Sequence, residues 1–335
     1  MAVAPEANFH TSMHCASKLN IGFIGLGALG EGLCNSLVKA GYSVTVNDLH
    51  KDLATRLLAA GARWSDDIAG ACREADVLIT ALPSPAVSRQ VVEGPGGVFD
   101  SLPRGGIWVE MSTTDLEDLQ RLQGVAAQRG ISVLECPVTG GVHLANSGEI
   151  TVLVGGDEAV YKRVEPLLQT IGGQIIFLGK LGSASVVKVV TNMLAFIHLV
   201  AAAEAMMVPA KYGVDLDAAY RAIRASSGNS FVHETESQLI LSGSYNVKFT
   251  MDLACKDLGL VNSIAQKLGV PLELGSMTQQ IFTRARGLFG GNAQSPEVAR
   301  MIEQACALEL RAPGYPSELL AEMGAPRPSG TQPKA

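Results

Sequence analysis

The chain has 335 residues, 47% of them hydrophobic and only 17% charged, so it is long enough for two well-packed domains and too apolar for a disordered protein. A net charge of −6 argues against a nucleic-acid-binding surface and favours a small-molecule partner. Six scattered cysteines without a CxxC pair, and a start at residues 1–19 without the basic and apolar parts of a secretion signal, predict a cytoplasmic protein.

The first ordered elements are predicted after a loose extension at residues 1–19. An apolar run at residues 20–24 predicts a strand, and a helical pattern follows at residues 31–40. Between them the glycine-rich motif GxGxxG reads Gly25, Leu26, Gly27, Ala28, Leu29, Gly30. Between a strand and a helix, such a turn lets backbone approach a pyrophosphate at the helix N-terminus. We therefore predict a dinucleotide site; the alternative is an ordinary glycine-rich turn.

A second strand, predicted at residues 43–46, ends at an acidic residue. Asp48 lies about 20 residues after the glycine motif, where a carboxylate accepts hydrogen bonds from ribose hydroxyls and repels a 2′-phosphate. Leu49 follows, at a place where an arginine could have bound that phosphate. These residues favour NAD over NADP. The alternative is that Asp48 caps the next helix.

Further strands are predicted at residues 76–81, 106–110, 132–135 and 150–154. In a doubly wound sheet the ligand crosses the carboxyl ends of the strands, so Leu82, Pro83 and Thr113 are expected beside the nicotinamide half of the cofactor. After the strand at 132–135 come Thr139, Gly140 and Gly141, and a hydroxyl followed by two glycines exposes backbone N–H groups suited to a carboxylate. An ordinary turn remains the alternative reading of those three residues.

A long helix is predicted from residue 182 to residue 213. Apolar residues occupy all its sides, so we expect it to be buried on nearly every face, and its uncharged part between Lys188 and Glu204 is too short to cross a bilayer. Asn192 follows Lys188 by four residues, so both side chains can address one point. Burial and the helix dipole should lower the pKa of Lys188 and make it a candidate proton acceptor. The alternative is a snorkelling lysine beside an asparagine bonded to backbone.

The rest of the chain has no strand pattern, and helices are predicted at residues 218–225, 252–267 and 296–310. Lys256 and Asp257 stand near a helix start, either in a site or as a surface ion pair. We therefore predict an α/β protein with a Rossmann-type doubly wound sheet at residues 20–181. An all-α second domain at residues 182–320 is joined to it by the long helix, and residues 321–335 are a flexible tail.

Taken together, the motifs resemble those of the β-hydroxyacid dehydrogenase family, in the family's order and at about its intervals, over roughly residues 20–310. The matching segments are residues 25–30, 82–83, 112–113, 137–141, 182–192 and 256–260.

The resemblance implies a reversible, NAD(P)-linked oxidation of a 3-hydroxy acid to its semialdehyde or keto acid, without a metal. Lys188 matches the family's catalytic lysine, a general base in oxidation and a general acid in reduction, and Asn192 matches the residue that holds the substrate beside it. Thr139, Gly140 and Gly141 match the loop that binds the carboxylate. Lys256 matches a lysine that closes over the cofactor.

Four positions depart from the family's usual residues: Thr139 replaces serine, His143 and Ala184 replace glycines, and Thr191 replaces asparagine. Threonine keeps the hydroxyl and adds a methyl group, which predicts a tighter carboxylate pocket. We expect His143 to be a hydrogen-bonded residue that covers the loop rather than a substrate ligand. Residues 226–234 lie where the family's substrate-side helices begin.

Two alternatives to an NAD-dependent dehydrogenase stay open. One is an NADPH-dependent semialdehyde reductase of the same fold, and the other is a dinucleotide-binding interaction module without catalysis. In each case the long helix is apolar on all sides and the second domain alone can hardly cover it, which predicts a homodimer or homotetramer. Membrane and nucleic-acid partners are not expected.

Overall fold

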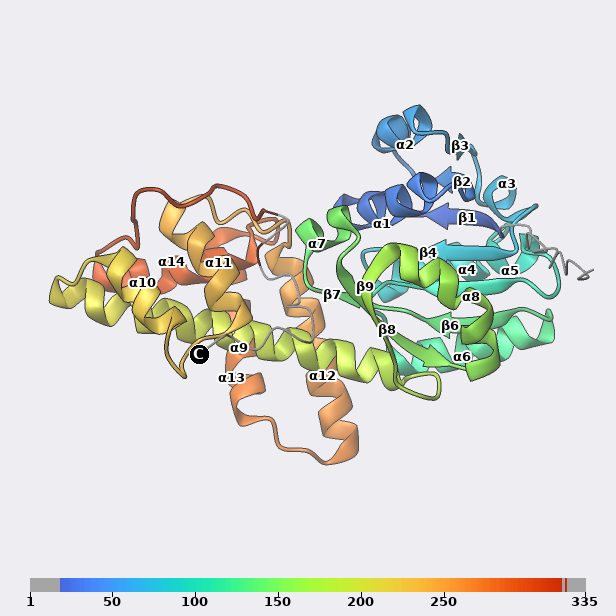
Figure 1. Ribbon diagram of the computed structural model, residues 1–335. Coiled ribbons are helices and arrows are strands. Elements are labelled where there is room, and N and C mark those ends of the chain that lie inside the picture. The colour runs from blue at the N-terminus through green and yellow to red at the C-terminus, as the bar shows by residue number, and fades with distance from the viewer. Residues whose placement is uncertain (1–18, 321–322, 324–335) are drawn as a thin grey trace, which may run out of the picture.

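The computed structural model describes residues 19–320 and Met323, and it consists of a sheet domain and a helical domain joined by one long helix (Figure 1). This arrangement confirms the predicted Rossmann-type sheet with an all-α second part. Apart from residues 19 and 323, the two flexible ends expected at 1–19 and 321–335 lie outside the described residues.

Among the described residues, nine strands form the sheet in the order β3-β2-β1-β4-β5-β6-β8-β7, with β9 beside β8. The strands are β1 (Asn20–Ile24), β2 (Ser43–Asn47), β3 (Arg63–Trp64), β4 (Val77–Thr80), β5 (Ile107–Glu110), β6 (Ser132–Glu135), β7 (Val138–Thr139), β8 (Ile150–Gly156) and β9 (Gly172–Phe177). The strands β3, β2, β1, β4, β5 and β6 are parallel, whereas β8 runs antiparallel to β6 and β7. The order reverses beside β1, where such sheets bind their ligands.

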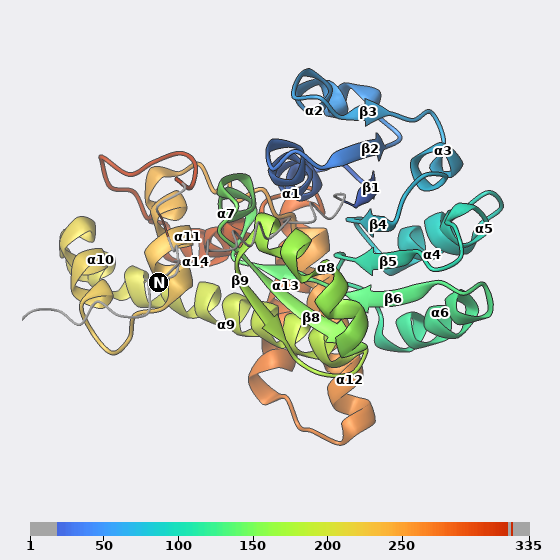
Figure 2. The ribbon, with the colours of Figure 1, turned by 45° about the vertical axis from the view of Figure 1, so that its right-hand side comes forward.

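Helices connect and cover these strands. In the sheet domain they are α1 (Ala28–Lys39), the 3-10 helix η1 (Lys51–Ala54), α2 (Thr55–Ala59), α3 (Ile68–Cys72), α4 (Pro85–Glu93), α5 (Val98–Ser101), α6 (Leu116–Gln128), α7 (Val142–Ser147) and α8 (Glu158–Ile171). The long helix is α9 (Ser183–Tyr212), followed by α10 (Leu216–Arg224), α11 (Phe231–Ser242), α12 (Met251–Leu268), α13 (Glu273–Phe289), η2 (Ser295–Ala299) and α14 (Arg300–Cys306). Both ribbon views place α7 on the side of the sheet domain that faces the helical domain (Figures 1 and 2).

The alternating side chains of the central strands explain why helices cover both faces of the sheet. In β4 and β5, Ile79 and Val109 enter the hydrophobic core under α1 and α8, while Leu78 and Trp108 enter the core under α5 and α6. Successive residues of a strand point to opposite faces, so fully apolar strands need a helical layer on each side. Because helices cover both faces, the carboxyl ends of the strands are the side of the sheet that stays accessible.

The sequence interpretation was wrong about the segment predicted as one helix at residues 296–310. The chain forms η2 and then α14, which ends at Cys306 because Ala307 takes a left-handed conformation with φ 47°. Strands β3, β7 and β9 were not predicted. Two of them have only two residues, and β9 has three exposed positions, so none shows a long apolar run.

Helix α9 is less buried in the single chain than its composition suggested. It packs on β8 at its start and on α10 to α14 further along, but Val190, Leu194, Val208 and Tyr212 are exposed. Within the described residues it is the one helix long and apolar enough to cross a membrane, with a mean hydropathy of 1.9. The expectation of a run too short to cross a bilayer concerned only the uncharged part between Lys188 and Glu204, and the whole helix is longer. The core helix of a soluble protein gives the same values.

Candidate active site

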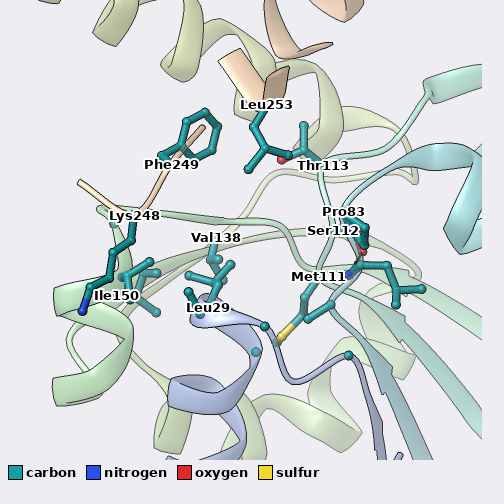
Figure 3. Close-up of a pocket in the computed structure, with 18 of the residues that line it drawn as sticks. Leu29, Pro83, Met111, Ser112, Thr113, Val138, Ile150, Lys248, Phe249 and Leu253 are labelled. Carbon is teal, nitrogen blue, oxygen red and sulfur yellow. Dashed lines mark hydrogen bonds between the residues drawn. The ribbon is translucent and has the colours of Figure 1, made fainter. Parts of the chain in front are cut away.

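A cavity of about 1820 Å³ lies between the carboxyl ends of the strands and the helical domain. It is lined by every predicted site residue except Leu26, and these are Gly25, Gly27, Ala28, Leu29, Gly30, Asp48, Leu82, Pro83, Thr113, Thr139, Gly140, Gly141, Lys188, Asn192 and Lys256. In Figure 3, Phe249 and Leu253 of the helical domain lie across the pocket from Leu29 and Val138 of the sheet domain. The fold thus brings segments far apart in sequence to one cavity.

The glycine turn between β1 and α1 has the shape that a pyrophosphate needs. Gly25 has a φ of 98°, which favours glycine, and a side chain at Gly30 would collide with the Gly25 carbonyl. Gly27 is the N-cap of α1, no side chain caps the helix, and open space lies where a Cβ of Gly27 would stand. The free N–H groups at this helix start would hold the phosphates of a dinucleotide, so these residues fit the cofactor.

Asp48 is anchored by backbone at the end of β2. Its Oδ2 accepts a hydrogen bond from the Leu26 N–H at 2.7 Å, and its Oδ1 accepts one from the His50 N–H at 3.0 Å. Each oxygen keeps a further lone pair for a ribose hydroxyl. Asp48 does not cap the next helix, whose N-cap is His50, and Leu49 is 96% exposed. Leu26 is itself buried, so it contributes through its backbone alone.

A buried carboxylate that sequence analysis missed organises the ends of β4 and β5. Glu110 Oε1 accepts a hydrogen bond from the Ser112 N–H at 2.9 Å, and Ser112 Oγ accepts one from the Leu82 N–H at 2.7 Å. Burial raises the pKa of Glu110, and hydrogen bonds from Ser112 and other hydroxyls oppose that shift. The chain of bonds fixes Leu82 relative to Thr113, the neighbour of Ser112, at the edge of the cavity.

The loop after β7 carries the predicted carboxylate site. Gly140 and Gly141 have φ values of 123° and 97°, which is the region that favours glycine. Gly141 is the N-cap of α7, and no side chain caps that helix. Thr139 and both glycines line the cavity, so the uncapped backbone N–H groups and the threonine hydroxyl are available to an anion.

Lys188 and Asn192 contact each other as their spacing predicted. Lys188 Nζ donates a hydrogen bond to Asn192 Oδ1 at 2.8 Å, and Asn192 Nδ2 donates one to Asp257 Oδ2 at 2.5 Å. Asp257 Oδ1 lies 3.0 Å from Lys256 Nζ, which also donates to the Thr113 carbonyl at 3.1 Å. This chain of four side chains links α9 and α12 to the sheet domain, and Asp257 is only 1% exposed.

The environment of Lys188 shifts the amine toward its neutral form. Its side chain is 8% exposed, so it does not snorkel to solvent. Burial lowers the pKa of Lys188 to about 8, and the Lys256 ammonium adds to that shift while the Asp257 carboxylate opposes it. The predicted direction of the shift is confirmed. An amine with such a pKa exchanges protons near neutral pH.

The start of α9 is held by a second carboxylate that sequence analysis missed. Glu135, at the end of β6, accepts hydrogen bonds from the N–H groups of Gly182, Ala184 and Ser185 at 2.5, 2.9 and 3.0 Å. It also accepts one from Ser185 Oγ at 2.5 Å. Burial raises the pKa of Glu135, and these donors oppose the shift. The contact spans about 50 residues of sequence, and no local pattern marks it.

The two positions whose roles were open from the sequence lie at the cavity. His143 Nε2 is 2.8 Å from the Met323 carbonyl oxygen, and burial lowers the pKa of this histidine. His143 therefore has a backbone partner, as expected, while it also lines the cavity. From the segment 226–234, Asn229, Ser230, Phe231 and Val232 line the cavity. The helical side of the pocket also includes Lys248, Phe249 and Leu253 (Figure 3).

Two family models match this chain, one over the sheet domain and one over the helical domain. Residues 20–179 match the family model described as the NAD binding domain of 6-phosphogluconate dehydrogenase. Residues 182–302 match the model described as NAD-binding of NADP-dependent 3-hydroxyisobutyrate dehydrogenase.

Among characterised relatives, a 2-(hydroxymethyl)glutarate dehydrogenase of Eubacterium barkeri is 33% identical over 86% of this chain and 96% of its own. An L-threonate dehydrogenase of Escherichia coli K12 is 32% identical over 87% of this chain and 97% of its own. Among solved structures, a 3-hydroxyisobutyrate dehydrogenase of Salmonella typhimurium is 31% identical, with a TM-score of 0.79 over 85% of this chain and 100% of its own.

Proposed function

The chain belongs to the β-hydroxyacid dehydrogenase family of NAD(P)-dependent enzymes, and we propose that it oxidises a small 3-hydroxy acid to the semialdehyde or keto acid, with NAD as cofactor. The substrate would be similar to 3-hydroxyisobutyrate, serine or threonate. The observation that carries the proposal is the hydrogen bond between the buried Lys188 Nζ and Asn192 Oδ1, in the cavity that the glycine turn also lines.

In this proposal Lys188 moves the proton. Its neutral amine accepts the hydroxyl proton of the substrate during oxidation, and its ammonium returns a proton to the carbonyl oxygen during reduction. Nicotinamide, when bound, supplies the acceptor for the hydrogen and the two electrons that leave the carbinol carbon. Asn192, held by Asp257, is fixed beside the amine and would orient the substrate hydroxyl.

The substrate carboxylate is proposed to bind the loop formed by Thr139, Gly140 and Gly141, through its hydroxyl and its backbone N–H groups. Lys256 is proposed to close over the cofactor, because its bond to the Thr113 carbonyl places it where the two domains meet. Binding the acid at one end leaves its hydroxyl-bearing carbon free to face Lys188.

NAD is proposed over NADP because the Asp48 carboxylate, anchored by Leu26 and His50, would repel a 2′-phosphate. The competing interpretation is an NADPH-dependent semialdehyde reductase, and the matched family model, described as that of an NADP-dependent dehydrogenase, favours its cofactor only. A third interpretation is a binding module without catalysis. The presence of Lys188, Asn192 and Lys256 together in one cavity argues against it.

The proposed function is tested with a panel of hydroxy acids and each of the two oxidised cofactors. We expect reduced nicotinamide to form, seen by its absorbance, with at least one 3-hydroxy acid and faster with NAD than with NADP. Faster turnover with NADP would overturn the cofactor assignment. Cofactor binding without turnover of any acid, or of any semialdehyde in the reverse direction, would favour the binding module.

The rate of oxidation should depend on pH through Lys188. Because burial lowers the pKa of this amine to about 8, its neutral fraction rises with pH and levels off above that value. We expect kcat/KM for oxidation to increase up to about pH 8 and then to level off, and kcat/KM for reduction to fall above it. Steady-state rates between pH 6 and 10 (roughly two units either side of the lowered pKa) measure both profiles. Parallel profiles in the two directions would contradict the proton transfer.

We also propose that the protein is a homodimer or homotetramer. The exposed apolar residues of α9 and α13, which include Val208, Tyr212, Leu274 and Met277, form surface that a second copy could cover. Light scattering coupled to gel filtration at micromolar concentration should give a multiple of the chain mass of 35.1 kDa. A mass equal to one chain would contradict the proposal.

A cytoplasmic location is proposed from the cysteines, which are free thiols at all five described positions, Cys34, Cys72, Cys136, Cys255 and Cys306. Fractionation of the source cells would test it, and recovery of the protein outside the cytoplasm would contradict it.

A further inference from the structure

One carboxylate at the cavity has no role in the chemistry described above. Glu236 lies in the second turn of α11, on the helix face that it shares with Val232 and Thr235, and all three residues line the cavity. Residues three and four apart share a helix face, so this edge of the pocket is formed by one stripe of α11. The sequence did not single out Glu236.

Glu236 is an exception among the polar side chains of its helix. Thr235 Oγ1 donates to the Phe231 carbonyl at 2.8 Å, and His233 Nε2 is 3.0 Å from the Tyr220 carbonyl oxygen. Among the described residues, by contrast, no group donates to the buried Glu236 Oε2. Burial raises the pKa of Glu236 to about 7. Glu236 is half-buried as a residue, but a buried carboxylate oxygen without a donor destabilises a fold, which points to a partner that is not part of the chain.

A second unpartnered acceptor lies at the same cavity. Asn229 precedes α11, and its Nδ2 donates to Glu234 Oε1 at 2.5 Å, which fixes the orientation of the amide. Its Oδ1 is buried and has no donor among the described residues. A third such oxygen, Asp257 Oδ1, also belongs to the cavity, but the Lys256 ammonium lies 3.0 Å from it. Among the described residues, the helical side of the cavity therefore offers two acceptors without a donor or a cation beside them, a carboxylate oxygen and an amide oxygen.

We propose that Glu236 Oε2 and Asn229 Oδ1 form a subsite that accepts hydrogen bonds from hydroxyl groups on the tail of the substrate. The inference rests on the proposed function and deepens it, because it selects a polyhydroxylated acid among the possible 3-hydroxy acids. A substrate with an alkyl tail would leave both acceptors unpaired. A substrate with a second carboxylate would place it beside the Glu236 carboxylate, and the two like charges would repel each other. The subsite would therefore discriminate against both of these classes.

The test compares three acids that differ in the tail: threonate, 3-hydroxyisobutyrate and 2-(hydroxymethyl)glutarate. With Glu236→Leu, we expect kcat/KM for threonate to fall by about 10- to 100-fold, the effect of losing a hydrogen bond to a charged group. The value for 3-hydroxyisobutyrate should stay the same or rise, because leucine removes an acceptor that an alkyl tail leaves unpaired. Glu236→Gln keeps an acceptor, so it should retain most of the rate with threonate and improve the rate with the dicarboxylic acid. Asn229→Ala should lower the rate with threonate only.

Glu158→Leu is the matched control, because Glu158 is an exposed carboxylate of α8 outside this cavity, and it should change none of the three rates. Equal losses for all three acids in Glu236→Leu, or a wild-type preference for the alkyl or dicarboxylic acid, would overturn the inference and leave the proposed function standing.

If wild type oxidises none of the acids, the proposed function fails. Calorimetric Kd values of the acids, measured with NAD present, then decide the subsite, and equal Kd values for threonate in wild type and Glu236→Leu would overturn it.

Discussion

Replacing Lys188 with alanine is expected to lower kcat for oxidation by about 10²- to 10⁴-fold while leaving the Kd of the cofactor almost unchanged. The neutral amine is the one group proposed to take the substrate proton, and the other lysine of the cluster is already engaged. Lys256 Nζ donates to the Thr113 carbonyl and pairs with Asp257, so it has no free approach to the substrate hydroxyl. Reduced nicotinamide absorbance gives kcat, and fluorescence titration gives the Kd of the cofactor.

Two further variants separate proton transfer from other roles of the same cluster. Lys188→Arg keeps a cation that stays protonated, so it should be about as inactive as Lys188→Ala. Lys256→Ala removes the contact between the domains and should raise the KM of the cofactor more than it lowers kcat. Wild-type turnover by folded Lys188→Ala would remove Lys188 from the mechanism, and thermal unfolding confirms that each variant is folded.

Features that depend on short stretches of sequence could be predicted. Strands β1 and β6 have the predicted bounds, and each contains a short buried apolar run. The contact between Lys188 and Asn192 follows from helix geometry alone, because residues four apart stack on one face. The glycine turn could be placed because its meaning comes from the strand before it and the helix after it.

Features that depend on distant residues could not be predicted. Asn192 bonds to Asp257, 65 residues later, and nothing near either residue indicates the partner. The unpartnered Glu236 reads in the sequence like any polar residue of a surface helix, because its burial is created by packing of α11 against other elements. The predicted burial of the long apolar helix was wrong for a different reason. Composition indicates that a surface favours burial, but it does not indicate whether the same chain or another one covers that surface.

Replacing Glu135 with alanine is expected to destabilise the protein strongly, with a loss of about 3–5 kcal/mol in the free energy of unfolding. The carboxylate accepts hydrogen bonds from three backbone N–H groups at the start of α9 and from the Ser185 hydroxyl, and all of these donors are in a buried setting. Alanine would leave them without an acceptor. Urea and thermal unfolding, followed by circular dichroism, measure the loss.

Activity should fall together with stability, because Glu135 joins the end of β6 to the helix that carries Lys188 in its second turn. Glu135→Gln keeps one acceptor oxygen but places an N–H₂ group against donors, so its loss should be intermediate. Glu149→Ala removes an exposed carboxylate of the same domain and should change stability by less than about 0.5 kcal/mol. If Glu135→Ala were as stable as Glu149→Ala, the start of α9 would be held by its apolar contacts with the sheet domain, and the carboxylate would not be what positions Lys188.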